Sequence, residues 1–552
     1  MSSGKLYRTT GVSFTGQRKI LLMNSHSREG VYVTPAMGIF KVAEFARKRG
    51  IDCDILDYDI DDDSEFIKNA ERGEYAVIAM SVTHYQMEAD LERLWMFRKC
   101  AEKSGNPVII AGGGQEAAMN YEQWLDAALD IVFLGFAEVT FYEFCRRVLD
   151  ADRKLFDLSA LADGLKGMTY RDQGGKLVFH YADTMDHDKF RGMFYDSVLE
   201  MDVPYQKYWD YLRQSFKGRD VGGAGFIFEH VRLYGTSHCP RRCGFCSSQT
   251  FLPFSQEATP KISMLDADQL VHLVVHHYQK YGAKLVIFSD DDFLVGPGVG
   301  ARRALSFCKG IIAAKKSGDL PSDFHFHFQA RIADVLTRHQ INMELLQALV
   351  DAGCMGCSLG VETFSEKLIK SPSINKIGVT VTDCRDVLNA MLDIGMVPQI
   401  NIILGPPEST VEDLIDTIKV VAEFIEKGAD IALVTRVEVY PGSPLSMNRK
   451  YPYHSRTWTN PHNGQSIEIA DYFKSWDQDI ERVCTNFNKA RDAELDLIKK
   501  RYGWENQIIH KRIVAFGSII AILKILERPD LVRDISGVME RIIQQSGDKA
   551  AE

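Results

Sequence analysis

Short apolar runs alternate with amphipathic segments along the first 150 residues. The runs have the length of buried strands, and the segments between them repeat apolar residues at helical spacing. Strands are expected at residues 19–24, 52–56, 75–80, 107–111 and 130–134, and helices at 36–48, 88–103 and 139–149. This alternation over residues 17–150 predicts an α/β unit with a doubly wound parallel sheet. Such sheets bind ligands beyond the carboxyl ends of their strands.

A second strand–helix series begins near Gly225. Strands are expected at residues 226–228, 285–288, 324–328, 356–361, 397–404 and 431–439, with helices at 266–281, 301–315, 343–352, 381–394 and 411–427. Eight such repeats close a full barrel, so six predict a partial, open (β/α)6 barrel over residues 222–450. Residues 151–221 are interpreted as a connector with a short hairpin at Gly174-Gly175, and residues 451–552 as a helical carboxyl-terminal domain.

The chain has 552 residues, of which 45% are hydrophobic and 25% are charged, as in soluble globular proteins of several domains. A net charge of −10 argues against nucleic-acid binding through bulk positive charge. No apolar stretch approaches the roughly 20 residues that span a bilayer, and residues 1–16 lack the apolar core of a secretory signal. With 11 cysteines in so long a chain, we expect a cytoplasmic protein whose thiols are mostly reduced.

Three cysteines stand close together at C-x-x-x-C-x-x-C spacing: Cys239, Cys243 and Cys246. They follow an expected strand and therefore lie in a loop. Thiolates at this spacing suit an iron–sulfur cluster, and three of them leave one iron of a four-iron cluster open to an outside ligand. The alternatives are a zinc site with a distant fourth ligand and a chance grouping of structural cysteines.

This motif within a partial barrel resembles the radical S-adenosylmethionine superfamily. The resemblance implies that the three cysteines hold a four-iron four-sulfur cluster, that S-adenosylmethionine chelates the open iron, and that Phe245 packs beside its adenine. It also implies contacts at later strand ends. These are Asp290, Asp291 and Asp292 for the methionine amino group, Arg331 for its carboxylate, Glu362, and Asn401, Ile403 and Gly405 near the adenine. Taken singly, each such residue is more typical of a strand end, a helix cap or a surface ion pair.

The unit at residues 17–150 resembles the cobalamin-binding domain, of Rossmann or flavodoxin-like fold, that precedes the barrel in many relatives. Small and polar residues follow its third, fourth and fifth strands, where they let the backbone approach a bulky ligand. The resemblance implies cobalamin contacts at Ser81, Thr83, Gly112, Gly113, Gly114, Gly135 and Glu138. The alternative is a similar sheet without a cofactor or with a nucleotide, although no G-x-G-x-x-G motif follows the first strand.

His325, His327, Gln329 and Arg331 alternate along one expected strand and therefore share a face, while phenylalanines take the other face. This pattern predicts a polar barrel interior. His325, His327 and Gln329, together with Tyr440 at the end of the sixth strand, are therefore candidates for a substrate pocket. A hydrogen-bonded histidine pair without a chemical role is the alternative.

Together the resemblances imply a cobalamin-dependent radical S-adenosylmethionine enzyme and favour a methyltransferase. One S-adenosylmethionine would methylate the reduced cobalt, and another would yield a 5′-deoxyadenosyl radical that abstracts hydrogen from an unactivated carbon, which then takes the methyl group. The expected partners are a small-molecule substrate and a single-electron donor such as flavodoxin or ferredoxin, with no nucleic acid and no membrane span. The alternatives are a radical rearrangement or cyclisation without methyl transfer, and an iron–sulfur sensor or electron carrier.

Overall fold

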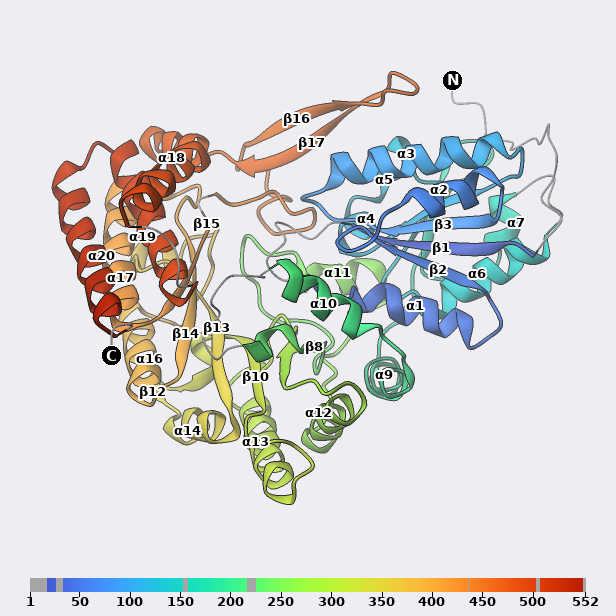
Figure 1. Ribbon diagram of the computed structural model, residues 1–552. Coiled ribbons are helices and arrows are strands. Elements are labelled where there is room, and N and C mark those ends of the chain that lie inside the picture. Colours follow the sequence, from blue (N-terminus) through green and yellow to red (C-terminus); the bar gives the residue numbers. More distant parts are fainter. Residues whose placement is uncertain are drawn as a thin grey trace.

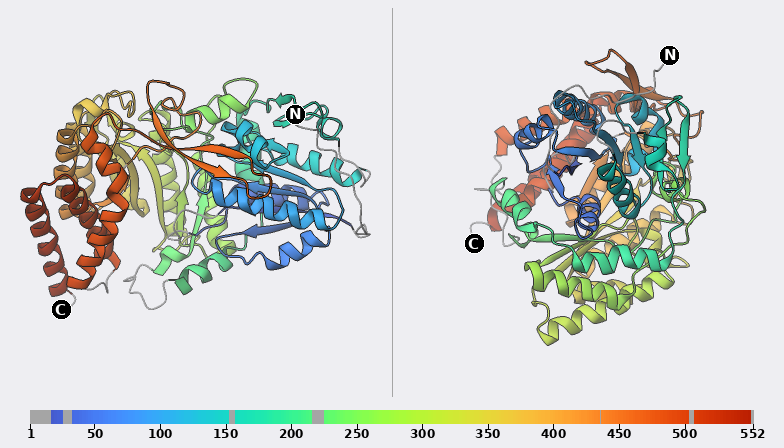
Figure 2. Two further views of the ribbon diagram at one scale, coloured as in Figure 1. Left: turned by 90° about the horizontal axis from the view of Figure 1, so that it is seen from above. Right: turned by 90° about the vertical axis from the view of Figure 1, so that its right-hand side faces the viewer.

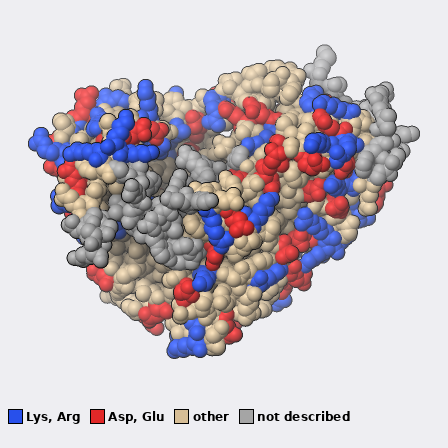
Figure 3. Space-filling view, viewed as in Figure 1, with Lys and Arg blue, Asp and Glu red and all other residues tan. Residues whose placement is uncertain are grey.

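The computed structural model describes residues 17–25, 33–151, 157–215, 225–434, 436–502 and 507–549. A sheet domain, an open barrel and a layer of carboxyl-terminal helices follow one another across the molecule (Figure 1). The α/β fold class is confirmed, with a mostly parallel amino-terminal sheet and a second sheet of six parallel strands. On the face shown in Figure 3, acidic and basic side chains are interspersed. Within the described ranges, no helix combines the length and apolar character that crossing a membrane requires.

The amino-terminal domain is built on a seven-stranded sheet of order β2-β1-β3-β4-β5-β6-β7. Its parallel strands are β1 (Lys19–Asn24), β2 (Cys53–Asp57), β3 (Tyr75–Ser81), β4 (Ile109–Gly113) and β5 (Ile131–Phe133). One face is covered by α1 (Met37–Arg47) and α6 (Glu138–Asp150), and the other by α2 (Ser64–Glu71), α3 (Met87–Lys103) and α5 (Tyr121–Ala127). Neighbouring strand residues such as Ile20 and Leu21 enter the two opposite cores.

Two features of this domain differ from the sequence interpretation. The hairpin at Gly174-Gly175, assigned to the connector, adds β6 (Met168–Arg171) and β7 (Leu177–His180) to the sheet as antiparallel strands. Helices α2 and α5 were not predicted, because the eight residues of α2, SEFIKNAE, and the seven of α5, YEQWLDA, are too short to show a helical period. The hairpin and these helices all contribute residues to the two cores of the sheet.

The central domain is a sheet of six parallel strands in the order β15-β14-β13-β10-β9-β8. The strands are β8 (His230–Leu233), β9 (Leu285–Phe288), β10 (His325–Arg331), β13 (Cys354–Glu362), β14 (Val397–Ile403) and β15 (Asp430–Val434). The helices between successive strands are α12 (Ala267–Tyr281), α13 (Val299–Ser317), α14 (Met343–Ala352), α16 (Val381–Asp393) and α17 (Val411–Lys427). This is the expected partial (β/α)6 arrangement, and it brings all six strand carboxyl ends to one edge.

The two outermost barrel strands were misplaced from the sequence. The apolar run predicted as the first strand forms a 3-10 turn at Gly225–Phe228, and β8 begins at His230 instead. The run predicted as 431–439 divides at Val434, and the segment beyond it pairs with a later hairpin, where the Val439 N–H donates to Asp471 O at 2.9 Å. A short apolar run indicates a buried segment but does not reveal its neighbour.

The carboxyl-terminal region begins with a hairpin that the helical interpretation of residues 451–552 missed. Strands β16 (Tyr453–Thr459) and β17 (Ser466–Phe473) precede the helices α18 (Gln478–Tyr502), α19 (Gln507–Ile525) and α20 (Pro529–Lys549). The hairpin lies across the amino-terminal domain (Figure 2), where Trp458 enters that domain's core and His462 stacks on Trp95 at 5.6 Å. The hairpin therefore joins the carboxyl-terminal region to the amino-terminal domain.

Candidate functional site

The three motif cysteines lie in the loop between β8 and α11 (Ser248–Ser255), at the carboxyl edge of the barrel. All three are half-buried and none is in a disulfide. Backbone contacts hold this loop: the Gly244 N–H donates to Ile374 O at 3.4 Å, and the Leu445 N–H donates to Gly244 O at 3.0 Å. A Cβ at Gly244 would lie 1.9 Å from the Pro372 carbonyl oxygen, so the close approach requires glycine.

The thiols of this loop suit metal coordination. Burial raises the pKa of Cys239 to about 12 and also raises the pKa of Cys246, so a bare thiolate would be unfavourable here. Bound iron supplies the positive charge that stabilises deprotonated sulfur. Across the described residues, no three metal-binding side chains converge on a single ion. A cluster tolerates such an arrangement because each sulfur binds a different iron.

The acidic run after β9 divides into three environments. Asp290 is buried and accepts a hydrogen bond from Thr236 Oγ1 at 2.6 Å, so it holds the loop after β8. Burial raises the pKa of Asp290 to about 6. Asp292 is fully buried, with Oδ2 3.6 Å from Arg241 Nε. Asp291 is exposed and lines the interdomain cavity described below. Asp290 and Asp291 both line this cavity, and Asp291 is the exposed one of the two.

Arg241, inside the cysteine motif, joins the cluster loop to the end of β10. Its guanidinium donates to Asp334 Oδ1 at 2.9 Å, and Asp334 Oδ2 accepts from the Arg331 N–H at 2.8 Å. Burial, and then the nearby Asp292, raise the pKa of Asp334. The Nε of Arg331 is buried and makes no hydrogen bond within the described ranges, so it is available to a ligand. Sequence reasoning singled out Arg331 and missed Arg241, although the latter lies within the motif.

Glu362, at the end of β13, is held by a lysine that the sequence analysis did not identify. The Lys376 Nζ lies 2.8 Å from Glu362 Oε1 and also donates to the Gly360 carbonyl, and both charged side chains are buried. Glu362 has a φ of +69°, a conformation that non-glycine residues rarely adopt. The neighbouring Asn375 donates to the carbonyl of Arg242 in the cysteine motif. The loop carrying Lys376 therefore contacts both the strand end and the cluster loop.

The residues predicted near the adenine come together in part. Phe245 packs against a small apolar cluster that contains Ile403, Val437 and Val439. Asn401 is half-buried in β14, and Gly405 is buried just beyond the end of that strand. An apolar surface thus lies directly beside the cysteine loop, as a flat purine ring requires.

The histidines of β10 lie at the other end of the strand from the cysteine loop. His325 is the first residue of β10, and its Nδ1 is 3.3 Å from the Gly353 carbonyl oxygen. Arg331 ends the strand about 20 Å away at the usual rise per residue. The predicted alternation is present: Phe326 is in the core while His327 is half-buried on the opposite face, and burial lowers the pKa of His327 to about 4. The structure therefore does not bring His325 to the carboxyl edge.

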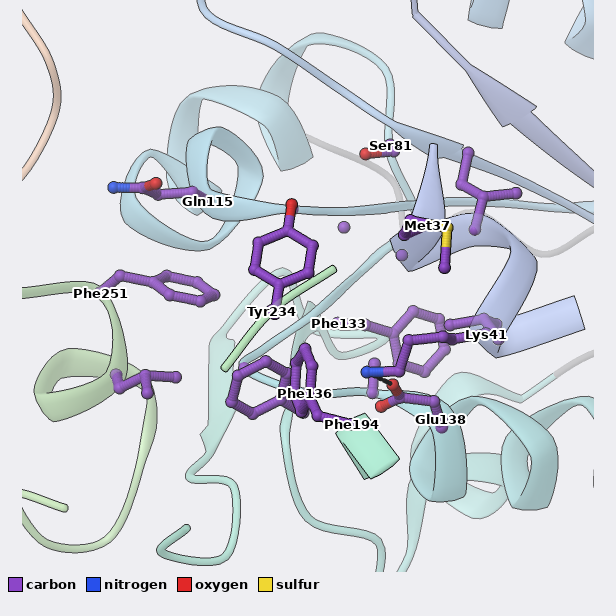
Figure 4. A pocket seen from close by; sticks show the side chains of 18 of the residues that line it. Met37, Lys41, Ser81, Gln115, Phe133, Phe136, Glu138, Phe194, Tyr234 and Phe251 are labelled. Carbon is purple, nitrogen blue, oxygen red and sulfur yellow. Dashed lines mark ion pairs between the residues drawn. The ribbon is translucent and has the colours of Figure 1, made fainter. Parts of the chain in front are cut away.

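A cavity of about 460 Å³ opens where the carboxyl edges of the two sheets face each other (Figure 4). Its amino-terminal wall contains six of the predicted cobalamin contacts, namely Ser81, Gly112, Gly113, Gly114, Gly135 and Glu138. Its barrel wall contains Tyr234, Thr236, His238 and Asp291. Thr83, the seventh predicted contact, is not among the lining residues, and its N–H donates to the buried Asp90 carboxylate at 3.2 Å. The cavity therefore connects the two halves of the predicted site.

Among the cavity residues that the sequence analysis did not identify, Lys41 and Phe194 contact each other. Lys41 of α1 forms a buried ion pair of 2.9 Å with Glu138, and its Nζ lies 3.5 Å from the centre of the Phe194 ring. Phe194 comes from a π-helical turn, Gly192–Asp196, a distortion frequent at functional sites. The sequence could have indicated Lys41, because this lysine stands among the apolar positions of an amphipathic helix.

The cavity retains hydrogen-bonding capacity for a large polar ligand. Glu138 Oε2 is buried and has no hydrogen-bond partner in the described part of the chain, so it can accept from a ligand's amide or hydroxyl. A second cavity, of about 520 Å³, shares Lys41, Phe136 and Glu138 with the first. Pockets of about 300–1,000 Å³ enclose drug-sized ligands. A corrin with its nucleotide tail is larger than such a ligand, so two adjoining cavities suit it.

Comparison with known families agrees with both halves of this site. Residues 28–145 match the B12 binding domain family, and residues 233–421 match the radical SAM superfamily. The chain therefore belongs to the radical S-adenosylmethionine superfamily and carries a B12-binding domain. It is a cobalamin-dependent radical S-adenosylmethionine enzyme, whose cofactors are a four-iron four-sulfur cluster, S-adenosylmethionine and cobalamin.

Solved structures show the same two-domain fold. The cobalamin-dependent S-adenosylmethionine radical enzyme OxsB, with aqua-cobalamin bound, has a TM-score of 0.66 at 14% identity, covering 97% of this chain and 80% of OxsB. The radical S-adenosylmethionine methyltransferase TsrM from Kitasatospora setae, with tryptophan substrate and a SAM analogue bound, has a TM-score of 0.58 at 13% identity, covering 83% of this chain and 86% of TsrM. No curated protein matches the chain at a significant level.

Proposed function

We propose that this enzyme transfers a methyl group to an unactivated carbon of a small-molecule substrate. The cavity between the two sheet edges carries the proposal, because its walls include Gly113 and Gly135 from the cobalamin side and His238 and Asp291 from the cluster side. A substrate there would meet both cofactors. The likeness to TsrM, which is described as a methyltransferase, supports methyl transfer as the outcome.

The residues of the barrel edge bind and orient S-adenosylmethionine in this proposal. Cys239, Cys243 and Cys246 hold the cluster, while Asp291 and Arg331 face the charged groups of its methionine. Phe245 packs with Ile403 beside the purine, and Glu362 contributes a carboxylate fixed by Lys376. When bound, the cofactors supply a carbon-centred radical and a transferable methyl group.

The amino-terminal sheet binds cobalamin through its strand ends. A Cβ on Gly113 would meet no atom within 4 Å, so the backbone leaves room for the corrin. The N–H groups at the start of α6 and the unpaired oxygen of Glu138 face the same space. Enclosure between two domains excludes water, which would otherwise quench reactive species.

The experiment uses protein purified and reconstituted without oxygen, reduced through flavodoxin or a chemical donor, with S-adenosylmethionine that carries a deuterated methyl group. A total small-metabolite extract serves as the substrate pool. We expect bound cobalamin, comparable yields of 5′-deoxyadenosine and S-adenosylhomocysteine, and a metabolite that gains the labelled methyl group. Deoxyadenosine without S-adenosylhomocysteine would refute methyl transfer and favour a rearrangement or cyclisation. Neither product, from protein with full iron content, would favour the sensor or carrier alternative.

A further inference from the structure

A third cavity, of about 250 Å³, lies where three distant parts of the chain meet. Its walls are His84, Tyr85 and Gln86 after β3, Arg436 and Glu438 after β15, and Arg456 and Asp471 of the hairpin. We propose that this cavity binds the amino and carboxylate groups of a free α-amino acid. The inference goes beyond the proposed function, because this cavity shares no lining residue with the cavity between the two sheet edges. As a statement about binding, it can be tested without turnover.

The backbone places Arg436 and Glu438 on one side of an extended segment. This segment pairs with β17, since the Val439 N–H donates to Asp471 O at 2.9 Å. Residues two apart in an extended chain share a face. Val437 and Val439 point the other way, into the apolar cluster beneath the cysteine loop. The guanidinium and the carboxylate therefore both face the cavity.

The Arg436 guanidinium has a fixed position and keeps N–H groups that can donate hydrogen bonds to a ligand. Its guanidinium lies 4.5 Å from the centre of the Tyr472 ring, which fixes its plane. The Asp471 carboxylate is 3.9 Å away, beyond hydrogen-bond distance. By contrast, Arg456 is engaged by Glu88 at 2.7 Å. A planar guanidinium with free N–H donors matches a carboxylate in a bidentate manner, which makes Arg436 the carboxylate contact.

Glu438 supplies the opposite charge. Its side chain is buried and accepts a hydrogen bond from the Tyr440 hydroxyl at 3.2 Å. A carboxylate has about four lone-pair sites, so it can accept further hydrogen bonds from an ammonium group. The two arginines and two carboxylates of the lining balance in charge, which suits a zwitterion better than an anion.

Two aromatic side chains of the lining, His84 and Tyr85, pack with Tyr440. The rings of His84, Tyr85 and Tyr440 lie 5.6–6.1 Å apart, and the His84 Nδ1 is buried without a hydrogen bond inside the described ranges. Its nearest carboxylate, 3.4 Å away, belongs to Glu116, whose neighbour Gln115 lines the cofactor cavity. The short helix α4 (Gln115–Met119), which carries Gln115 and Glu116, therefore lies between this cavity and the proposed cobalamin site. The volume of the cavity admits a molecule of amino-acid size.

The test is equilibrium dialysis of cluster- and cobalamin-loaded protein against an equimolar mixture of the twenty common L-α-amino acids. Mass spectrometry quantifies what is retained. We expect the wild type to retain one amino acid or a few related ones. Arg436→Gln and Glu438→Gln should each weaken that binding about tenfold, as expected for the loss of one charge-assisted contact. Arg449→Gln, at an exposed position in the turns that follow this segment, is the matched control and should bind normally.

Derivatives of the retained amino acid separate the two contacts. The carboxamide should bind wild type and Arg436→Gln equally, and the N-acetyl form should bind wild type and Glu438→Gln equally. Retention of no amino acid by the wild type, or undiminished binding by Arg436→Gln, overturns the proposal. Iron and cobalamin contents report whether each variant is folded. Because dialysis needs no turnover, failure here is distinguishable from failure to cleave S-adenosylmethionine or to transfer a methyl group.

Discussion

Replacing Lys376 with methionine should destabilise the carboxyl edge of the barrel. The Lys376 Nζ is 2.8 Å from Glu362 Oε1, and the two side chains are only 6% and 9% exposed. At that separation the attraction is about 6 kcal/mol in an effective dielectric of about 20, and the desolvation of both charges offsets part of it. Removal of one partner leaves the other charge buried and uncompensated, so we expect the free energy of unfolding to fall by about 3–5 kcal/mol.

The same change should weaken S-adenosylmethionine binding. Glu362 occupies a strained backbone conformation that persists only while its surroundings enforce it. Asn375, beside Lys376, bonds the carbonyl of Arg242 in the cysteine motif, so release of the lysine loosens the cluster loop as well. We expect the dissociation constant of S-adenosylmethionine to rise about tenfold or more, equivalent to about 1.4 kcal/mol.

Urea unfolding of cluster-loaded protein, followed through the visible absorbance of the cluster, measures the stability, and calorimetric titration measures the affinity. Lys367→Met is the surface control: Lys367 is 60% exposed and pairs with Asp413 at 3.2 Å, so its loss should cost less than about 1 kcal/mol. The double variant Glu362→Gln/Lys376→Met removes both charges and should regain stability without regaining affinity. Equal stability of Lys376→Met and wild type, or a double variant no more stable than the single one, would refute the reasoning.

Three further changes test other parts of the molecule. Cys243→Ala should abolish 5′-deoxyadenosine formation while Cys100→Ala retains it, and an unchanged yield from Cys243→Ala would contradict the cluster assignment. Burial raises the folded pKa of Asp90 to about 6. Its stabilising contribution is therefore complete below the unfolded value of about 3.9 and is lost as pH rises through 6. Between about pH 5 and 7.5 the wild type should lose about 1 kcal/mol relative to Asp90→Asn in urea unfolding, and parallel pH profiles would argue against this. Trp458 is buried, so Trp458→Ala should lower the free energy of unfolding by about 3–5 kcal/mol and make the hairpin susceptible to trypsin. Trp476 is exposed, so Trp476→Ala should have neither effect. Equal cleavage of the two variants would contradict the packing of the hairpin on the amino-terminal domain.

Local signals made much of the architecture readable from the sequence. The periodicity of apolar residues identified most of the parallel strands of both sheets, and the spacing of Cys239, Cys243 and Cys246 identified the cluster loop, because each depends on residues close together in the chain. Small residues at strand ends likewise marked the cavity wall at Gly112 to Gly114. The hairpin β16–β17 escaped detection because most residues of β16 are exposed, while Trp458 packs on the amino-terminal domain, far away in the sequence.

The sequence by itself determined that two units of alternating strands and helices follow one another along the chain. It also determined the chemistry of the cysteine motif. Tertiary structure alone decided which charges are buried and paired. Lys41 meets Glu138, Arg241 meets Asp334, and Arg436 stacks on Tyr472 across loops or domains. It also placed His325 far from the edge where sequence pattern had grouped it with Arg331. The physical reason is that the periodicity of side chains along a helix or strand indicates which face a residue occupies. Contacts between residues distant in the chain depend instead on how the elements pack together.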